Sequence, residues 1–131
     1  MTVGRPTPVP ARTRLTAGDA RRVAAGGAAG AVVRWAVVTW AASSSAFPWP
    51  TLLVNLVGCL VVGMLFRSPR STVMLLGVGF AGGLTTFSTF AVEVAALLDG
   101  TDPGTAVAYV VTSVLGGVAA VVVGGWASLR W

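Results

Sequence analysis

Residues 79–90 read GFAGGLTTFSTF, and this short stretch decides the fold of the chain. Glycines weaken a helix, and the hydroxyl side chains that follow compete for its backbone hydrogen bonds. The stretch lies inside a hydrophobic segment, residues 72–98, which is longer than the roughly 20 residues that a straight membrane helix needs. We therefore expect an interrupted membrane helix whose freed backbone groups bind an ion, with carbonyls suited to a hard cation such as Na⁺.

The composition excludes an ordinary soluble domain. Of 131 residues, 55% are hydrophobic and 10% are charged, and the mean hydropathy is +0.83. A soluble protein carries about a quarter charged residues. The net charge of +5 comes from arginines at the ends of hydrophobic stretches, so we expect no nucleic-acid partner. The sequence has no histidine and a single cysteine, Cys59, which excludes a disulfide framework and a Cys/His metal site.

Four hydrophobic stretches predict four membrane spans, at about residues 23–42, 51–66, 72–98 and 105–127. Residues 1–22 are rich in arginine and proline and are predicted to form a mobile tail, with a helix starting near Thr16. Residues 128–131 form a short C-terminal end. The predicted fold is therefore an all-α membrane protein of four transmembrane helices, the third of them broken, with residues 23–127 as its membrane domain.

Two signatures of other functions are interpreted as coincidental. Residues 77–82, GVGFAG, match the G-x-G-x-x-G pattern of dinucleotide-binding folds, but no strand is predicted before them and their surroundings are hydrophobic. Arg21 and Arg22 resemble a twin-arginine signal, but Arg34 interrupts the hydrophobic stretch after them and three further spans follow. The sequence also contains no G-K-[S/T] phosphate loop, so it encodes no nucleotide-driven pump.

The arginines predict the orientation in the membrane. With four spans, the termini and the turn between spans two and three lie on one side, which carries eight arginines, while the opposite side carries none. The eight are Arg5, Arg12, Arg14, Arg21, Arg22, Arg67, Arg70 and Arg130. By the positive-inside rule, both termini are predicted to be cytoplasmic in a multi-pass protein of a bacterial plasma membrane.

Polar side chains inside the spans are the candidate functional residues, because each needs a partner or a pathway in lipid. Arg34 in the first span either attracts anions to a water-filled vestibule or pairs with a helix C-terminus. Asn55 in the second span lies one turn after Thr51. Its amide either joins two helices or donates hydrogen bonds to an anion that has lost its water.

The third span carries a cluster of hydroxyl side chains. Four of them, Thr85, Thr86, Ser88 and Thr89, fall within five consecutive positions. At helical spacing, Thr85, Ser88 and Thr89 share one face. Glu93 lies four residues after Thr89, so we expect it to accept hydrogen bonds from that face.

Aromatic and hydroxyl side chains complete the candidate set. Phe87 and Phe90 lie three residues apart, and they either pack in the core or turn their weakly positive ring edges towards a small anion. Tyr109 and Ser113 lie on one face of the fourth span, where each hydroxyl either bonds to its own backbone or lines a pathway.

Three motifs together resemble the CrcB or Fluc family of fluoride channels. They are GGAAGAVVR at residues 26–34, TLLVN at residues 51–55, and GFAGGLTTFSTF at residues 79–90 followed by Glu93. The resemblance covers all four spans. It implies a small subunit that dimerises in antiparallel fashion, with the broken third helices crossing at the centre. It also implies a passive, fluoride-selective channel that exports cytoplasmic fluoride, lowers its toxicity and holds a structural Na⁺ at the dimer centre.

The resemblance also implies which residues act. The backbone carbonyls of Gly82 and Thr85, contributed by both subunits, are implied to bind the central Na⁺. A hydroxyl track is implied on the fourth helix, but Gly117 and Ala119 stand where further hydroxyls are expected, which puts one ion pathway in doubt. The side chains implied along the fluoride pathway are Arg34, Thr51, Asn55, Thr86, Phe87, Ser88, Thr89, Phe90, Glu93, Tyr109 and Ser113.

The one-sided arginine count departs from the simplest picture of this family. An antiparallel homodimer needs each chain to insert both ways, which calls for a nearly balanced count. We therefore expect a heterodimer with a related four-span chain of the opposite charge bias. The alternative function is a small proton-coupled exporter of the multidrug type, with Glu93 as its proton carrier.

Overall fold

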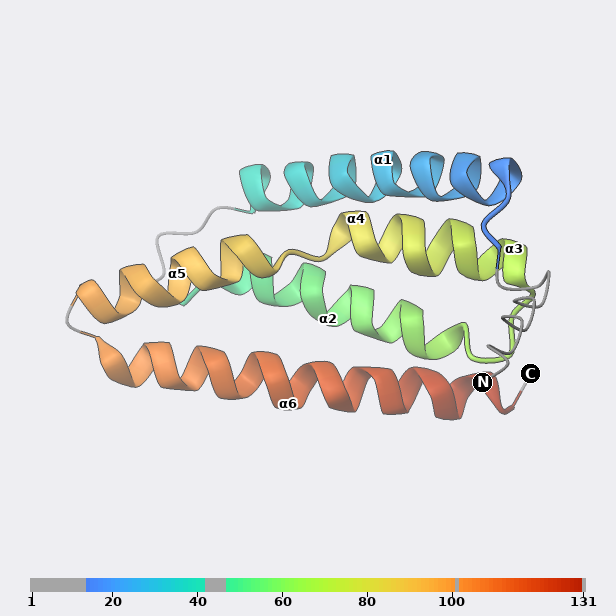
Figure 1. The fold of residues 1–131 in the computed structure, drawn as a ribbon. Helices are drawn as coiled ribbons and strands as arrows, with labels where there is room; N and C mark the ends of the chain where they lie inside the picture. Colours follow the sequence, from blue (N-terminus) through green and yellow to red (C-terminus); the bar gives the residue numbers. More distant parts are fainter. Residues whose placement is uncertain (1–13, 42–46, 101, 131) are drawn as a thin grey trace, which may run out of the picture.

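The computed structural model describes residues 14–41, 47–100 and 102–130, and within these ranges it contains helices and no strand (Figure 1). Residues 1–13 of the predicted tail lie outside the described residues, whereas residues 17–22, predicted as part of the same tail, belong to the first turns of α1. The elements in chain order are α1 (Ala17–Trp40), α2 (Trp49–Met64), α3 (Arg70–Thr72), η2 (Val73–Ala81), α4 (Gly82–Leu84), α5 (Phe87–Asp99) and α6 (Pro103–Ser128). The described part of the chain is therefore helical, as its hydrophobic stretches predict.

The lengths of these helices fit a membrane protein. Three stretches are long and hydrophobic enough to cross a bilayer, namely α1, the composite stretch Arg70–Asp99 and α6. Helix α2 is also hydrophobic but has 16 residues, which corresponds to about 24 Å of helix. It ends at Met64, two residues before the end of the predicted span.

Each long helix begins at a recognisable signal. Thr16 caps α1 by accepting a hydrogen bond from the Asp19 N–H, and the Asp19 carboxylate accepts one from the Thr16 N–H. The helix thus starts where the sequence predicts it. Asp102 caps α6, followed by Pro103 at the first helical position. Hydrogen bonds from the Thr105 side chain and backbone N–H lower the pKa of the Asp102 carboxyl below its usual 3.8.

The predicted interruption of the third span lies at Thr85 and Thr86. Both residues have extended backbone, with φ −77° and ψ 154° at Thr85 and φ −147° and ψ 118° at Thr86. The preceding glycine-rich segment does not break the helix. It winds as the π-helix η2, a rare form that is found mostly as short bulges near functional sites. The polypeptide therefore leaves the helix at the hydroxyl residues and re-enters it at Phe87.

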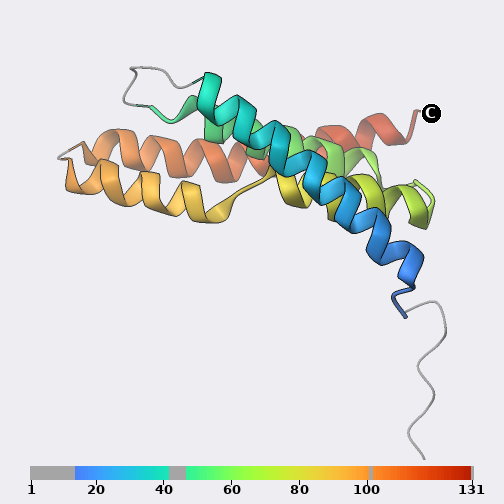
Figure 2. The ribbon, with the colours of Figure 1, turned by 90° about the horizontal axis from the view of Figure 1, so that it is seen from above.

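Close backbone packing holds the helices around this break. Helix α1 lies against η2 and α4, and α2 lies against α6. Figure 2 shows α1 crossing obliquely over the composite helix. A Cβ at Gly30 would overlap the Phe80 carbonyl oxygen, and one at Gly83 would overlap the Gly27 carbonyl oxygen. Glycines let helices approach this closely in a membrane protein.

Apart from Arg34 and Glu93, the charged residues of the described ranges belong to segments near one end or the other of the bundle (Figure 1). Arg70 Nη2 donates to Asp19 Oδ2 at 3.0 Å and to the Arg14 carbonyl at 3.3 Å, which joins the start of α1 to the α2–α3 turn. The two acidic residues Asp99 and Asp102 flank the connection between α5 and α6 at the other end. Hydrogen bonds of Arg70 therefore hold the segments of the arginine-rich end together.

Candidate functional site

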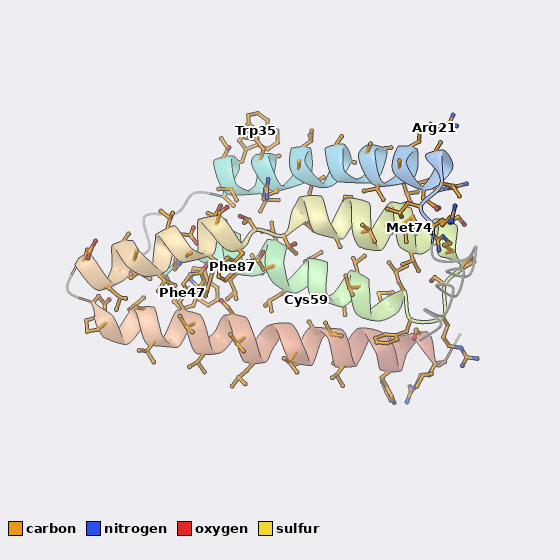
Figure 3. All side chains as sticks on the ribbon, in the orientation of Figure 1. Arg21, Trp35, Phe47, Cys59, Met74 and Phe87 are labelled. Atoms are coloured by element: carbon orange, nitrogen blue, oxygen red, sulfur yellow. The ribbon has the colours of Figure 1, made fainter. Side chains whose placement is uncertain are left out.

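A cavity of about 340 Å³ lies beside the helix break, between α2, α5 and α6. Figure 3 shows Cys59 and Phe87, two of its lining residues, in the middle of the bundle. The cavity combines an amide, a thiol and hydroxyls with two phenyl rings. Its lining residues are Asn55, Cys59, Thr85, Thr86, Phe87, Phe90, Ser113 and Val114.

Asn55 joins α2 to the break by two hydrogen bonds to a single residue. Its Oδ1 accepts from the Thr86 N–H at 2.8 Å, and its Nδ2 donates to the Thr86 carbonyl at 3.2 Å. The side chain thus acts as a partner for backbone groups that the helix no longer pairs. An amide nitrogen carries two hydrogens, so one N–H remains beyond the bond to Thr86. Of the two sequence interpretations, the helix-joining one is confirmed.

Arg34 completes the pairing of the break. Its Nη1 donates to the Thr85 carbonyl at 3.1 Å, and Thr85 is the C-cap of α4. This contact is the pairing with a helix C-terminus that the sequence left open for Arg34. The Thr85 N–H and hydroxyl both donate to the Ala81 carbonyl, each at 2.9 Å. With the Asn55 pair, every backbone N–H and carbonyl of Thr85 and Thr86 has a partner.

The hydroxyl cluster is arranged differently from the predicted face. Thr86 is the N-cap of α5: its Oγ1 accepts from the Thr89 N–H at 3.2 Å and donates to Thr89 Oγ1 at 3.0 Å. Ser88 Oγ lies 3.3 Å from the same Thr86 oxygen. Thr85 belongs to the preceding helix instead, because the break separates it from Ser88 and Thr89. The prediction that Thr85 shares their face is wrong.

Glu93 takes its hydrogen bonds from two other helices. Thr51 Oγ1 donates to Glu93 Oε1 at 2.7 Å, and the Tyr109 hydroxyl donates to Glu93 Oε2 at 2.7 Å. Thr51 and Tyr109 are both fully buried. The expected donor, Thr89, contacts Thr86 instead, so that prediction is wrong. The carboxylate therefore ties α2, α5 and α6 together and does not line the cavity.

The two phenylalanines lie beside one another but differ in exposure. Their ring centroids are 5.9 Å apart. Phe90 also packs against the Tyr109 ring, with centroids 5.1 Å apart, whereas Phe87 is 80% exposed on the surface of the bundle. Both rings line the cavity, Phe87 at the surface of the bundle and Phe90 against Tyr109.

One hydroxyl in the cavity has no hydrogen-bond partner among the described residues. Ser113 Oγ is buried and unpaired. Cys59 and Val114 also line the cavity, and the sequence analysis missed them as site residues. Cys59 lies four positions after Asn55, so its place on the same helix face was a usable signal. A second cavity of about 430 Å³ continues from Cys59 and Ser113 along α6 past Gly117, and its further lining is hydrophobic.

The two residues whose carbonyls are expected to bind Na⁺ belong to the last helical turn before the break, in α4 and at its C-cap. Gly82 is exposed, and a Cβ added there would meet no atom within 4 Å. The Thr85 carbonyl leaves the helix direction and keeps a second lone pair beside the bond from Arg34. Hard cations bind several oxygens, so the two carbonyls of one chain fit part of such a site. The described residues contain no group of three His, Cys, Asp or Glu side chains that could replace them.

Only some of the side chains predicted along the fluoride pathway line the cavity. Thr86, Asn55, Phe87, Phe90 and Ser113 line the cavity. Outside it lie Arg34, Thr51, Ser88, Thr89, Glu93 and Tyr109, which hold the walls and the break by the contacts given above.

The sequence matches one protein family over most of its length. Residues 22–125 match the family described as "CrcB-like protein, Camphor Resistance (CrcB)". This range contains every residue of the break and of the cavity.

Individual relatives are similar at high identity. "Fluoride-specific ion channel FluC 2" of Rhodococcus jostii is 49% identical over 100 residues, which are 75% of this chain and 88% of that protein. "Fluoride-specific ion channel FluC 1" of Mycolicibacterium paratuberculosis is 46% identical over 107 residues, 76% of this chain and 81% of that protein. "Fluoride-specific ion channel FluC" of Pseudomonas putida is 41% identical over 120 residues, 82% of this chain and 90% of that protein.

Proposed function

Because the chain belongs to the CrcB-like family, whose relatives carry the name of an ion channel and not of an enzyme, we propose that it is one subunit of a fluoride channel. The channel lets cytoplasmic fluoride leave the cell passively and so lowers its toxicity. It lies in the plasma membrane as a multi-pass protein, with α2 as the fourth crossing besides the three long helices.

The observation that carries this proposal is the unpaired Ser113 hydroxyl in a cavity with the Asn55 amide. Polar groups are costly inside a membrane unless they are satisfied or serve a pathway. The break itself has its backbone bonds made, so it presents a fixed shape and not a loose loop. Ser113 and the second N–H of Asn55 then remain as donors for an anion that passes.

The chemistry of fluoride fits such a site. Fluoride is small and tightly hydrated, so only closely spaced donors replace the water that it loses on entering a pore. The ring edges of Phe87 and Phe90 carry weak positive charge and add to the amide and hydroxyl donors without a full charge that would trap the ion. Because transport follows the electrochemical gradient, the missing nucleotide motif is expected.

A second chain closes the pathway. Phe87 is 80% exposed and the neighbouring Ser88 is also exposed, although both lie in the middle of the bundle length. The Ser88 hydroxyl lies 3.3 Å from Thr86 Oγ1, and lipid offers it no further hydrogen-bond partner at that depth. We propose that another subunit covers this face in antiparallel orientation, and that the Gly82 and Thr85 carbonyls of both chains hold a Na⁺ between them. That ion would supply positive charge to the facing carbonyl dipoles and so link the subunits.

The partner is proposed to be a different chain in the cell. The arginines of the described residues, Arg34 apart, gather at one end of the bundle and the acidic loop lies at the other. This asymmetry favours insertion with both termini in the cytoplasm. A related chain with the reverse bias would provide the opposite orientation. Reporter fusions at the C-terminus test this: a substantial outward-facing population of the chain expressed alone rejects a fixed orientation.

The contacts of Glu93 argue against a proton-coupled exporter. A proton carrier needs a carboxylate that opens to a cavity on each side in turn. Glu93 instead accepts two hydrogen bonds at 2.7 Å, and both donors come from fully buried residues.

Ion efflux from proteoliposomes tests the proposed function. The purified chain is reconstituted from detergent, which frees it from the orientation set during insertion and lets it pair with itself. We expect passive loss of internal fluoride without a proton gradient, and retention of chloride under the same conditions. Fluoride retention, or exchange of organic cations driven by pH, would reject the proposal.

A further inference from the structure

A second groove lies at the arginine-rich end of the bundle, away from the proposed pathway. It has a volume of about 450 Å³, within the range of small-molecule pockets, and lies between the end of α2 and the first turns of η2. Gly77 lets Leu65 pack closely in the groove, since a Cβ at Gly77 would lie 3.2 Å from Leu65 Cδ1. The lining is hydrophobic throughout and consists of Val62, Leu65, Phe66, Val73, Gly77 and Val78.

An exposed arginine lies next to this groove in the chain. Arg67 directly follows the lining residue Phe66, is exposed, and makes no hydrogen bond or ion pair to any described residue. The nearby carboxylate of Asp19 is already shared, with Arg70 at 3.0 Å and Arg22 at 3.9 Å. No acidic side chain in the described part of the chain is therefore available to Arg67.

Further arginines surround the same end. The Arg14 carbonyl accepts from Arg70, which brings Arg14 to the α2–α3 turn. The end of α6 also reaches this region, because a Cβ at Gly125 would lie 3.5 Å from Phe66 Cδ2. Beyond Gly125, the Arg130 guanidinium stacks on the Trp126 ring at 3.5 Å from its centroid. Basic side chains and a tryptophan at a helix end are typical of the headgroup level of a membrane.

We propose that this groove binds one anionic phospholipid, with its phosphate at Arg67 and an acyl chain along the groove. The hydrophobic lining accepts the chain, and the unpaired guanidinium recognises the phosphate diester. The cavity of about 430 Å³ along α6, described above, provides a contrast. No charged residue is adjacent in the chain to any of its lining residues, so it offers an acyl chain no headgroup contact. The inference concerns lipid recognition and is independent of which ion the protein conducts.

Native mass spectrometry of the purified chain in a mild detergent tests the binding. The probes are phosphatidylglycerol and phosphatidylcholine with identical acyl chains, titrated separately. We expect phosphatidylglycerol to bind with saturation at one tight site per chain. We expect phosphatidylcholine, whose choline cation offsets the charge of the same phosphate group, to bind at least about fivefold more weakly at this arginine-rich end. Equal binding of the two lipids would overturn the proposal.

Two pairs of variants locate the site. Arg67→Gln is expected to weaken phosphatidylglycerol binding about fivefold, whereas Arg21→Gln, at an exposed arginine of α1, is expected to leave it unchanged. Val78→Trp fills the groove and is expected to remove the tight site, whereas Val111→Trp, at an exposed position on α6, is not. Undiminished binding in both Arg67→Gln and Val78→Trp, or equal loss in each control variant, would contradict the assignment.

Discussion

Asn55 and Thr86 form a reciprocal pair, in which one side-chain amide binds both the N–H and the carbonyl of a single backbone residue. The arrangement matches what a neighbouring peptide group would provide. It comes from α2, whereas the unpaired groups belong to the interrupted third span. The break is therefore stable because a side chain from another helix takes over the hydrogen bonds that the extended backbone gives up.

Asn55→Ala removes both of these bonds and leaves the buried Thr86 groups unpaired. We expect the unfolding free energy in detergent to fall by about 2–4 kcal/mol, since each unsatisfied group costs about 1–3 kcal/mol. Fluoride efflux is expected to be lost as well. Cys59→Ala is the matched control, one turn away on the same cavity wall, and it should change stability by less than half as much. Equal stability of Asn55→Ala and wild type would contradict the role of the pair.

The Glu93 contacts predict a coupled unit across three helices. Tyr109→Phe and Thr51→Val each remove one 2.7 Å hydrogen bond to the carboxylate. Each change is expected to cost about 1.5–3 kcal/mol, because bonds to charged groups are stronger than neutral ones. In a double-mutant cycle measured by thermal unfolding, we expect a coupling energy of about 0.5 kcal/mol or more. Strict additivity would show that the two donors act independently.

The crossing of α1 over the composite helix depends on glycine at position 30. A Cβ there would overlap the Phe80 carbonyl, which is backbone and cannot turn aside. Gly30→Ala is therefore expected to lower stability by about 1–3 kcal/mol or more, as overpacking does. Gly82→Ala adds the same methyl group where nothing lies within 4 Å, and should leave the stability of the single chain within about 1 kcal/mol of wild type. A larger loss of stability in Gly82→Ala than in Gly30→Ala would contradict this packing.

Substitutions of Phe87 and of Phe90 are expected to have different effects, one on dimer formation and the other on folding of the chain. Phe87 is 80% exposed, so Phe87→Ala should hardly affect the folding of one chain but should weaken association, as seen in single-molecule counting or in the dissociation of the purified dimer. Phe90 packs on Tyr109, so Phe90→Ala should destabilise the chain itself by about 2–4 kcal/mol. An unchanged dimer in Phe87→Ala would place the interface elsewhere.

The sequence predicted the helical elements because their signals are local. The hydrophobic length of each span is read from the residues of that span alone. The interrupted third span was predicted for the same reason. Its position was less well defined, because glycines weaken an α-helix without specifying what replaces it, and here they form a π-helix.

Partners across helices were not predictable from one sequence. Helical spacing placed Thr89 beside Glu93, but that spacing assumes a continuous helix. Once the backbone extends at Thr86, the hydroxyls turn to cap α5 and the carboxylate meets Thr51 and Tyr109 from other helices. The hydrogen bonds of the Asn55 amide to Thr86 and the position of Cys59 in the cavity also depend on how α2 packs. Hydrophobic periodicity alone does not specify that packing.

The most direct test of the pathway is fluoride efflux through a Ser113→Ala variant reconstituted in liposomes. Its hydroxyl has no partner in the described structure, so its loss should leave the folded chain as stable as wild type. We expect fluoride efflux to fall about tenfold, the effect of one lost bond to an anion of about 1.5 kcal/mol. Thr112→Val, at the exposed neighbouring position, should conduct like wild type. Unchanged fluoride efflux in Ser113→Ala would contradict passage of the ion through this cavity.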